Sequence, residues 1–327
     1  MTGPTVPPWP RTGENGMSMN WGQVKRVLVV GGSGFVGRHL IEGLLAEGMT
    51  VRCLDLQSPA FEHESLESVE GSFTEPDVVE WAMDGCDAVY HLASSTIPKT
   101  SNEDPVGDVR VNLVGTLGLL DAASRHRIRK FVFISSGGTV YGKPESLPVS
   151  ETHPTEPICS YGVVKLSVEK YLQIYRHLHG LETCAVRLSN PYGPHQSPHR
   201  GQGVIAAFCY RALQGEAIQI WGDGSVVRDY VHIDDVVSAL LAVLSSKRAT
   251  GVINVGAGRG HSLLEVIDCV ERACGPVQKE FLAGRSFDVP AVYLDITRAR
   301  RLLEWVPRVE LKNGVGKLAQ VMRSEFL

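Results

Sequence analysis

The stretch VLVVGGSGFVGRHL, residues 27–40, restricts the fold of this chain more than any other segment. It ends an apolar run of strand length and continues into residues with helical spacing. Gly31, Gly34 and Gly37 stand at the junction. The first glycine permits a tight turn, the second lets the backbone approach a pyrophosphate, and the third lets the helix pack closely on the strand. Because free N–H groups at the helix N-terminus would face the phosphates, the sequence predicts a nucleotide site here.

Short apolar runs alternate with amphipathic segments over the first half of the chain. An almost wholly apolar run is expected for a strand that is covered on both faces of a sheet. Strands are expected at 24–30, 50–56, 86–94, 130–136 and 184–190. Helices are expected at 35–48, 112–126, 161–180 and 203–214. This alternation predicts an α/β protein with a doubly wound parallel sheet, the Rossmann architecture.

The alternation of strand and helix patterns ends at residue 190, after which a loop rich in Pro, Gly and His is followed by shorter mixed elements. After a flexible N-terminal tail (1–23) we therefore expect two parts. The first is a nucleotide-binding Rossmann domain (24–190), and the second is a smaller C-terminal α/β lobe for the substrate (191–327). The apolar run at 251–256 is expected to return to the main sheet as a further strand.

The composition argues against several classes of protein. A net charge of −4 without a long basic run gives no reason to expect nucleic acid as a partner. No apolar run approaches the ~20 residues of a membrane span, and the Pro- and Gly-rich tail lacks the apolar core of a signal peptide. The 7 cysteines form no CxxC pair, which fits buried free thiols in a reducing compartment. We therefore expect a cytoplasmic protein.

Asp55 ends the second expected strand, 18 residues after Gly37. A carboxylate there can accept hydrogen bonds from the adenosine ribose, and it would repel a 2′-phosphate. No arginine follows it in DLQSP (55–59). The alternative is an ordinary surface aspartate at a strand end. The glycine-rich turn favours the first interpretation, with NAD rather than NADP as the cofactor.

Tyr161 and Lys165 stand four residues apart in an expected helix, and hence on one face of it. A tyrosine has an ordinary pKa near ~10, so acting as a base at neutral pH requires help worth roughly 3–4 kcal/mol. A nearby ammonium and a positive nicotinamide ring would supply such help. Surface packing is the commonest reason for this spacing, but here the pair follows a nucleotide loop and a hydroxyl-rich strand end. We interpret Tyr161 and Lys165 as catalytic.

These segments together resemble the extended short-chain dehydrogenase/reductase family, especially its NAD-dependent nucleotide-sugar epimerases and dehydratases of the UDP-glucose 4-epimerase type. The resemblance covers about residues 24–310. It rests on the glycine triplet, on Tyr161-x-x-x-Lys165, and on six further motifs. These are HLAS (91–94), NLVGT (112–116), SSGGTVYG (135–142), RLSNPYGP (187–194), GDGSVVRDYVHIDD (222–235) and NVGAG (254–258).

The resemblance implies a mechanism with NAD as cofactor. Tyr161, as phenolate, would remove the proton from the 4-hydroxyl of a sugar while NAD takes the hydride from that carbon. Lys165 would hold the nicotinamide ribose and lower the pKa of Tyr161. The family pattern implies cofactor contacts at Gly31, Gly34, Phe35, Val36, Gly37, Asp55, Ser72, Phe73, Leu92, Ala93, Ser94, Asn112, Ser135, Tyr161 and Lys165.

The resemblance also implies where a nucleotide-diphosphate sugar would bind. Asn190, Arg228 and Arg285 would contact the diphosphate, for which guanidinium groups are well suited. Val204 would line the same region. Val292 matches a position whose bulk varies among galactose epimerases, and small residues there leave room for an N-acetyl group. N-acetylhexosamines are therefore one hypothesis for the substrate.

The sequence departs from the family pattern at two positions. Ser72 stands where many relatives carry an acidic residue, which makes it a weaker adenine contact. At Gly137 the family normally has Ser or Thr, within reach of the 4-hydroxyl, to relay the proton. Thr139 is expected on the same face of the strand as residue 137. Its hydroxyl, that of Ser136, or a water would then replace the relay.

The turn after this strand discriminates between reactions. Dehydratases of the family carry Asp-Glu at the positions of Gly138 and Thr139, and decarboxylases carry Glu at the second position. The lack of an acid here favours redox-neutral 4-epimerisation of a nucleotide-diphosphate hexose, with a UDP-sugar expected. One alternative is a 4-ketosugar reductase or dehydrogenase. The other is a non-catalytic NAD-binding protein, against which the retention of Tyr161 and Lys165 argues.

Family members commonly pair two helices, which match 112–126 and 161–178 here, into a dimer. Both segments have broad apolar faces, so a homodimer is expected, although a buried core face would look the same. The loop at 195–200 carries His195, His199 and Arg200, which are either solvated or in contact with an acidic substituent of the sugar. We expect no metal site, because no third ligand stands at suitable spacing. Polysaccharide biosynthesis and secondary-metabolite sugar supply are both compatible pathways.

Overall fold

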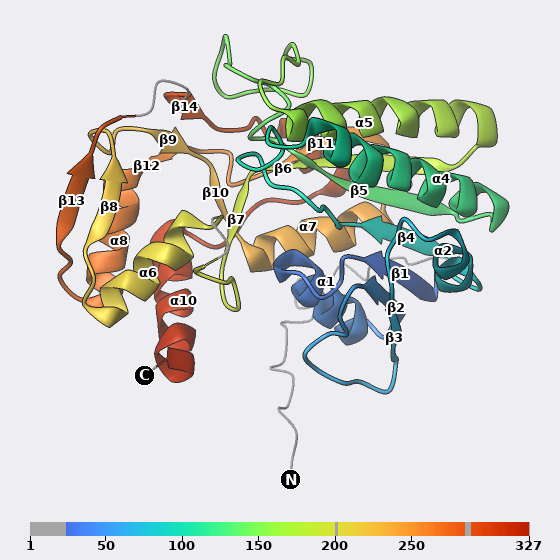
Figure 1. Ribbon diagram of the computed structural model, residues 1–327, viewed down its shortest axis with the longest axis horizontal. Helices are drawn as coiled ribbons and strands as arrows, with labels where there is room; N and C mark the ends of the chain where they lie inside the picture. Colours follow the sequence, from blue (N-terminus) through green and yellow to red (C-terminus); the bar gives the residue numbers. More distant parts are fainter. Residues whose placement is uncertain (1–23, 200–201, 285–288, 327) are drawn as a thin grey trace.

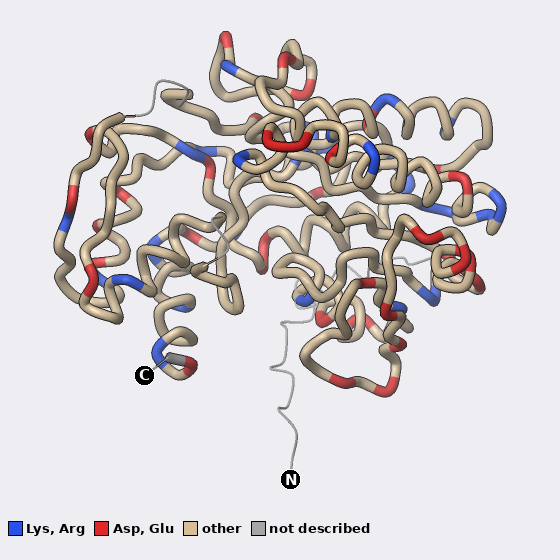
Figure 2. The backbone as a smooth tube through the Cα atoms, in the orientation of Figure 1, with Lys and Arg blue, Asp and Glu red and all other residues tan. Residues whose placement is uncertain are grey.

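The computed structural model describes residues 24–199, 202–284 and 289–326. The expected tail at 1–23 and the expected diphosphate contact Arg285 therefore lie outside the described residues. The described chain forms a large part, built on a parallel sheet with helices on both faces, and a smaller lobe beside it (Figure 1). Lys and Arg residues alternate with Asp and Glu residues over both parts (Figure 2).

The main sheet has seven parallel strands in the order β11-β6-β5-β4-β1-β2-β3. Its strands are β1 (Arg26–Val30), β2 (Thr50–Asp55), β3 (Leu66–Glu70), β4 (Ala88–His91), β5 (Lys130–Ser136), β6 (Glu182–Leu188) and β11 (Gly251–Val255). The direction of winding reverses between β1 and β4, and ligands of doubly wound sheets bind beyond the carboxyl ends of strands at such a point. The expected return strand is β11, which pairs with β6.

Helices cover both faces of this sheet, which explains why its inner strands are almost wholly apolar. One face is covered by α1 (Phe35–Ala46), α7 (Ile233–Ser245) and α9 (Thr297–Leu303). The other face is covered by α2 (Pro76–Met83), α4 (Gly115–Arg125) and α5 (Ser160–His179). Although α7 and α9 come late in the chain, their side chains pack into the core of the large sheet.

Several elements of the large part were not expected from the sequence, namely α7 and α9 as well as β3 and α2. β3 is an edge strand of the sheet, and its sequence LESVE has only one buried residue, Val69. It therefore gives no apolar run. α2 follows it and begins at Pro76, a residue suited to the first turn of a helix.

The smaller lobe is built on helices and very short strands. Its helices are α6 (Val204–Gln214), α8 (Leu263–Cys274) and α10 (Leu311–Phe326), which share one apolar core. Its strands are β7 (Asn190–Tyr192), β8 (Ile218–Trp221), β9 (Val227–Arg228), β10 (Tyr230–His232), β12 (His261–Ser262), β13 (Lys279–Leu282) and β14 (Ala291–Val292). Within the described ranges, no helix is long and apolar enough to cross a membrane.

Candidate active site

The glycine triplet lets three backbone segments approach one another closely: the turn after β1, the residues after β4, and the first turn of α1. Gly31 has a φ of 86°, and a Cβ there would lie 2.5 Å from the backbone nitrogen of Ala93. A Cβ on Gly37 would lie 2.2 Å from the carbonyl oxygen of Gly31. Gly34 caps α1 without a side-chain hydrogen bond, so the N–H groups of the first turn remain available to phosphate oxygens. This cradle fits a pyrophosphate.

The carboxylate of Asp55 lies at the end of β2 beside the glycine-rich turn. One of its oxygens accepts a hydrogen bond from the N–H of Ser33 at 2.9 Å, and the other accepts from the N–H of Leu56 at 2.7 Å. Each oxygen retains acceptor capacity for a ribose hydroxyl. The adjoining pocket is lined by Ser33, Gly34, Phe35, Arg38, Pro59, Ala60 and His195.

The remaining expected cofactor contacts lie on both sides of this crevice. Ser72 is engaged locally, since its hydroxyl lies 2.7 Å from that of Thr74. Phe73 packs edge-on against the ring of His91, with the centroids 5.1 Å apart. The N–H groups of Leu92 and Ala93 donate to the carbonyl of Val30. The contacts of these residues with NAD stay predictions.

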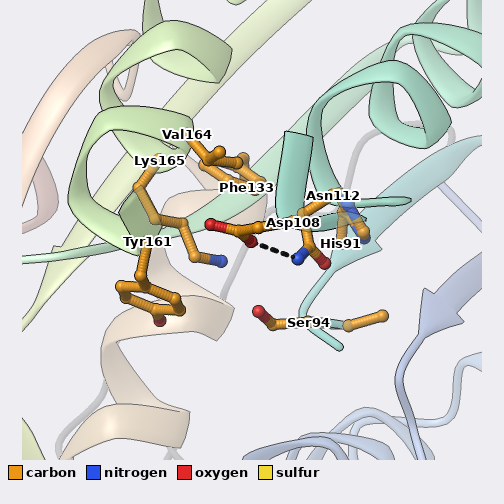
Figure 3. Close-up of a pocket in the computed structure, with 9 residues that line it drawn as sticks. His91, Ser94, Asp108, Asn112, Phe133, Tyr161, Val164 and Lys165 are labelled. Carbon is orange, nitrogen blue, oxygen red and sulfur yellow. Dashed lines mark hydrogen bonds between the residues drawn. The ribbon is translucent and has the colours of Figure 1, made fainter. Parts of the chain in front are cut away.

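A second pocket contains the expected catalytic pair (Figure 3). Tyr161 and Lys165 project from the first turns of α5 into the same space. The ammonium of Lys165 lies 5.3 Å from the centre of the Tyr161 ring and 4.6 Å from that of Phe133. It donates to the carbonyl oxygen of Ile134 at 2.8 Å. The pocket is lined by His91, Ala93, Ser94, Asp108, Asn112, Phe133, Tyr161, Val164 and Lys165.

Burial governs the acid–base properties of this pocket. Desolvation raises the pKa of Tyr161 well above its ordinary range, and the charges of Cys159 and Asp108 add to the effect. Desolvation lowers the pKa of Lys165 to about 8, while Asp108 and Glu169 oppose that change. The chain's own groups therefore do not supply the lowering of the Tyr161 pKa that the sequence suggested. Burial and Lys165 also lower the pKa of His91 to about 3, so this imidazole is neutral.

Asn112 is fixed by hydrogen bonds at both ends of its amide. Its oxygen accepts from the N–H of Ser95 at 2.9 Å, and its nitrogen donates to Asp108 at 2.7 Å. The segment Val109–Val114 that carries Asn112 is a π-helical stretch between α3 (Pro105–Asp108) and α4. Such stretches are frequent at functional sites.

The structure corrects the expected relation between Thr139 and Gly137. β5 ends at Ser136, and residues 137–139 form a turn, so the alternation of a strand does not relate Thr139 to Gly137. A Cβ on Gly137 would lie 2.6 Å from Cδ1 of Leu294, a core residue. A side chain at this position would require the end of the Leu294 side chain to shift. The absence of a relay hydroxyl at Gly137 stays a prediction.

Three hydroxyls near this strand end differ in their surroundings. The Ser135 hydroxyl donates to Glu169 at 2.5 Å, and Glu169 also accepts two hydrogen bonds from the buried guanidinium of Arg187. The Thr139 hydroxyl is sealed from solvent and has no hydrogen-bond partner among the described residues. Ser136 is half-buried at the last position of β5, and its hydroxyl is not among the sealed atoms.

The expected sugar contacts that can be placed come together in the small lobe. Arg228 in β9 is the register partner of Val292 in β14. The guanidinium of Arg228 donates to the carbonyl oxygens of Val227 and Val289 at 2.8 and 2.7 Å. Val204 is the first residue of α6, which follows the loop after β7.

Asp229 connects these short strands. Its carboxyl group accepts from the N–H groups of Ala257, Gly258 and Leu294 at 2.7, 3.2 and 3.2 Å. Its carbonyl oxygen accepts from the backbone N–H and the side-chain amide of Asn190. Burial raises the pKa of this carboxyl to about 6 against the effect of these donors. The position of Asn190 beside Arg228 thus depends on one buried acid.

Sequence reasoning missed the contributions of His91, Asp108, Ser160 and Asp229. Each stands inside or next to a motif that had been read for another residue: HLAS, NLVGT, Tyr161-x-x-x-Lys165 and the segment around Arg228. For Asp108 a signal was present, because it precedes Asn112 by four residues and so shares its helix face.

The chain is similar to known proteins over most of its length. It matches the family model of NAD dependent epimerase/dehydratases over residues 27–256. The UDP-glucose 4-epimerase of Mycolicibacterium smegmatis is 39% identical over an alignment of 311 residues that covers 92% of this chain and 99% of the relative. The crystal structure of a UDP-glucose 4-epimerase from Thermotoga maritima with UDP-glucose aligns with a TM-score of 0.88 at 33% identity, over 92% of this chain and 100% of that one. A dTDP-glucose 4,6-dehydratase of Streptomyces griseus is 32% identical over 304 residues, 89% of this chain and 92% of the relative.

The sheet, the glycine cradle and the Tyr–Lys helix define an NAD-binding protein of the extended short-chain dehydrogenase/reductase type. The chain belongs to the NAD-dependent epimerase/dehydratase family, and its cofactor is NAD. The predicted fold class and the predicted cofactor are thereby confirmed.

Proposed function

We propose that this protein epimerises a UDP-hexose at the 4-position and uses NAD as a retained cofactor. The observation that carries the proposal is the buried pocket in which Tyr161, Lys165 and Asn112 converge beside the glycine cradle. Relatives named UDP-glucose 4-epimerase match nearly the full length of the chain. The same family also contains dehydratases, so the choice of reaction depends on residues around the pocket.

We assign the following roles in the 4-epimerisation to residues of this chain. The glycine cradle and Asp55 would hold NAD, which would supply a hydride acceptor and donor for C4 of the sugar. Tyr161 takes the proton of the 4-hydroxyl, so that the C–O bond becomes a carbonyl, and returns the proton when the alcohol re-forms. Lys165 places an ammonium 5.3 Å from the centre of the Tyr161 ring, where a positive charge opposes the effect of burial on the phenol without overcoming it. Asn112 is locked in one orientation at the inner wall of the pocket.

We assign the proton relay to Ser136 rather than to Thr139. Ser136 is half-buried at the end of β5 and its hydroxyl is not among the sealed atoms, whereas the Thr139 hydroxyl is sealed and without a partner among the described residues. Ser136→Ala should lower kcat by roughly 10- to 100-fold, as expected for the loss of one proton-relay group. Thr139→Val should leave kcat within about threefold while keeping the volume. The reverse pattern would transfer the role to Thr139.

The turn after β5 disfavours elimination and decarboxylation. Gly138 and Thr139 bring no carboxyl group to this turn, so the site lacks the acid expected for expelling a 6-hydroxyl. A 4-ketosugar reductase would need exchangeable cofactor, and a non-catalytic NAD-binding protein would need neither Tyr161 nor Lys165. Epimerisation uses both residues and no external oxidant or reductant.

The test is incubation of the purified protein with UDP-glucose, UDP-N-acetylglucosamine, their uronates and their 4-epimers in deuterated water, without added cofactor. Proton NMR should show the 4-epimer with no deuterium at C4, because the hydride returns internally. Appearance of a 4-keto-6-deoxy sugar or a pentose would replace this proposal by dehydration or decarboxylation. Turnover only with added NAD(P)H would favour the reductase, and no turnover with any of these sugars would reject a UDP-hexose substrate.

We also propose that the protein is a homodimer formed through α5 and the helix before it. Val114, at the end of the π-helical segment that leads into α4, and Val163, Ile174 and Leu178 of α5 are exposed although they are large and apolar, and such patches mark interfaces. Light scattering should give twice the mass of the 35.6 kDa chain. Ile174→Glu should give the monomer mass, whereas a monomeric wild type would reject the proposal.

A further inference from the structure

Asp108 is a buried acid in the catalytic pocket to which the proposed chemistry gives no role. It is 1% exposed and lines the same pocket as Tyr161 and Lys165. Figure 3 shows its carboxylate between Asn112 and the two α5 side chains. A carboxylate is rarely buried to this degree without partners that compensate its desolvation. The partners of Asp108 therefore indicate what it does.

Three side chains from three segments donate hydrogen bonds to this one carboxylate. One oxygen accepts from the amide of Asn112 at 2.7 Å and from the hydroxyl of Thr96 at 2.8 Å. The other oxygen accepts from the hydroxyl of Ser160 at 2.6 Å. Asp108 thus connects the π-helical segment of Asn112 and the loop after β4 to the first residue of α5.

The link to Ser160 matters because Tyr161 is the next residue. Cys159, at the N-cap of α5, makes no side-chain capping bond. Instead, Asn102 accepts from the N–H of Ser160 at 2.9 Å, and Asp108 holds the Ser160 side chain. An acidic group near a helix N-terminus is also favoured by the helix dipole. The first turn of the helix that carries Tyr161 is therefore held by Asn102 and Asp108, which belong to other segments of the chain.

The charge of Asp108 also acts on the two titrating residues of the pocket. Its field favours the neutral phenol of Tyr161 and the ammonium of Lys165, which works against the phenolate in the first case. No ion pair joins Asp108 to Lys165, so this influence acts through space. The other titratable groups that act on this pair or share the pocket are Cys159 at the N-cap of α5, Glu169 within α5, and the neutral His91 from β4.

We infer that Asp108 is a positioning residue of the reaction centre: its hydrogen bonds hold Asn112 and the Tyr161 end of α5 in register, and its buried carboxylate shares the pocket with the phenol that acts as the base. The geometric part acts through Ser160 and Asn112. The electrostatic part acts directly on the phenol. The inference deepens the proposed epimerase function and rests on it for the kinetic consequence.

Asp108→Asn separates the two parts, because it keeps the shape and removes the charge. The amide oxygen can accept from Asn112 and Thr96, and the Ser160 hydroxyl can reverse to accept from the amide nitrogen. Removal of a nearby negative charge lowers the pKa of both Tyr161 and Lys165. Both limbs of the kcat/KM profile against pH should then move by ~1 pH unit toward lower pH. A purely structural role would lower the profile without moving it.

Glu103→Gln is the matched control, since Glu103 is an exposed acid only five residues before Asp108. It should leave both limbs and the maximum of the profile in place. If Asp108→Asn gives limbs that coincide with those of Glu103→Gln, the inferred electrostatic role is wrong.

If Asp108→Asn fails to fold, Ser160→Ala tests the geometric role, because it leaves the charge and removes the hydrogen bond to α5. It should lower kcat at least ~10-fold with unmoved limbs, and unchanged kcat would reject the positioning role.

A second readout does not require turnover. The near-ultraviolet absorbance of tyrosinate, taken as the difference between the wild type and Tyr161→Phe, titrates Tyr161 in the full-length NAD-loaded protein without any sugar. Against an Asp108→Asn background, the same difference should titrate ~1 pH unit lower. An unmoved titration would overturn the inference even if the wild type epimerises UDP-hexoses. A moved titration would support it even if the substrate proves to be a different sugar.

Discussion

The two halves of the candidate site are held together in different ways. The NAD half lies where long parallel strands end, and its geometry follows from backbone contacts of a few glycines at a reversal in the sheet. The sugar half is assembled from strands of two or three residues that meet around Asp229. The NAD half requires that its glycines carry no side chain, and the sugar half requires the buried carboxyl group of Asp229. Substitutions in the two halves should therefore fail for different reasons.

The largest effect is expected at the junction of the halves, for Tyr161→Phe. The phenylalanine keeps the buried ring against Lys165 and removes only the group that carries the proton. We expect kcat to fall by ~10³-fold, with NAD content and melting temperature unchanged. The measurements are steady-state kinetics and the absorbance spectrum of the purified protein. Activity within tenfold of the wild type would show that another group is the base.

The sugar half is tested by the pH dependence of stability at Asp229. Burial raises the pKa of this carboxyl to about 6 in the folded protein, above its unfolded value. Such a group binds its proton more tightly when folded, so its stabilising contribution is complete at low pH and is lost as pH rises through 4 to 6. The difference in unfolding free energy between wild type and Asp229→Asn should therefore fall by about 3 kcal/mol from pH 4 to pH 7.

Urea denaturation of the two proteins at several pH values measures this difference. The three backbone N–H donors work in the other direction, since they favour the carboxylate. A difference that instead grows with pH would mean that the donors outweigh burial. The sugar half would then be held by an anion, and the contrast with the NAD half would become sharper.

In the NAD half, Gly37→Ala should act by steric overlap alone. The new Cβ would lie 2.2 Å from the carbonyl oxygen of Gly31 and 2.6 Å from Cα of Gly32, and neither backbone atom can give way cheaply. We expect a loss of about 2 kcal/mol in stability together with loss of retained NAD. Gly118→Ala is the control, because a Cβ there meets nothing within 4 Å. It lies inside α4 and should stabilise the protein by ~0.5–1 kcal/mol. Equal effects of the two changes would contradict the spatial account.

The same contrast explains what the sequence could predict. Apolar strand runs, helical spacing and the glycine triplet are local signals, so β1, α1, β5 and α5 were expected close to their observed bounds. Strands of two or three residues leave no periodic signal, and so the small lobe stayed a general expectation. The relation of Thr139 to Gly137 was predicted wrongly because β5 ends at Ser136 and a turn follows, which the run of hydroxyl residues does not signal. Asp108 and Asp229 were missed because their partners come from several segments.

The smallest effect is expected for Val292, which decides how the sugar half treats substituents of the hexose. Val292 is the register partner of Arg228, so its backbone lies next to a proposed diphosphate contact, and its side chain is buried. If it borders the sugar, Val292→Tyr should reduce kcat/KM for UDP-N-acetylglucosamine ~10-fold more than for UDP-glucose. Val292→Ala is the control and should leave the ratio unchanged. Equal losses for both sugars, accompanied by a lower melting temperature, would mean that Val292 packs in the core of the lobe. Substrate choice would then belong to residues of the loop after β7. The specificity of the sugar half would in that case lie outside its helices and strands.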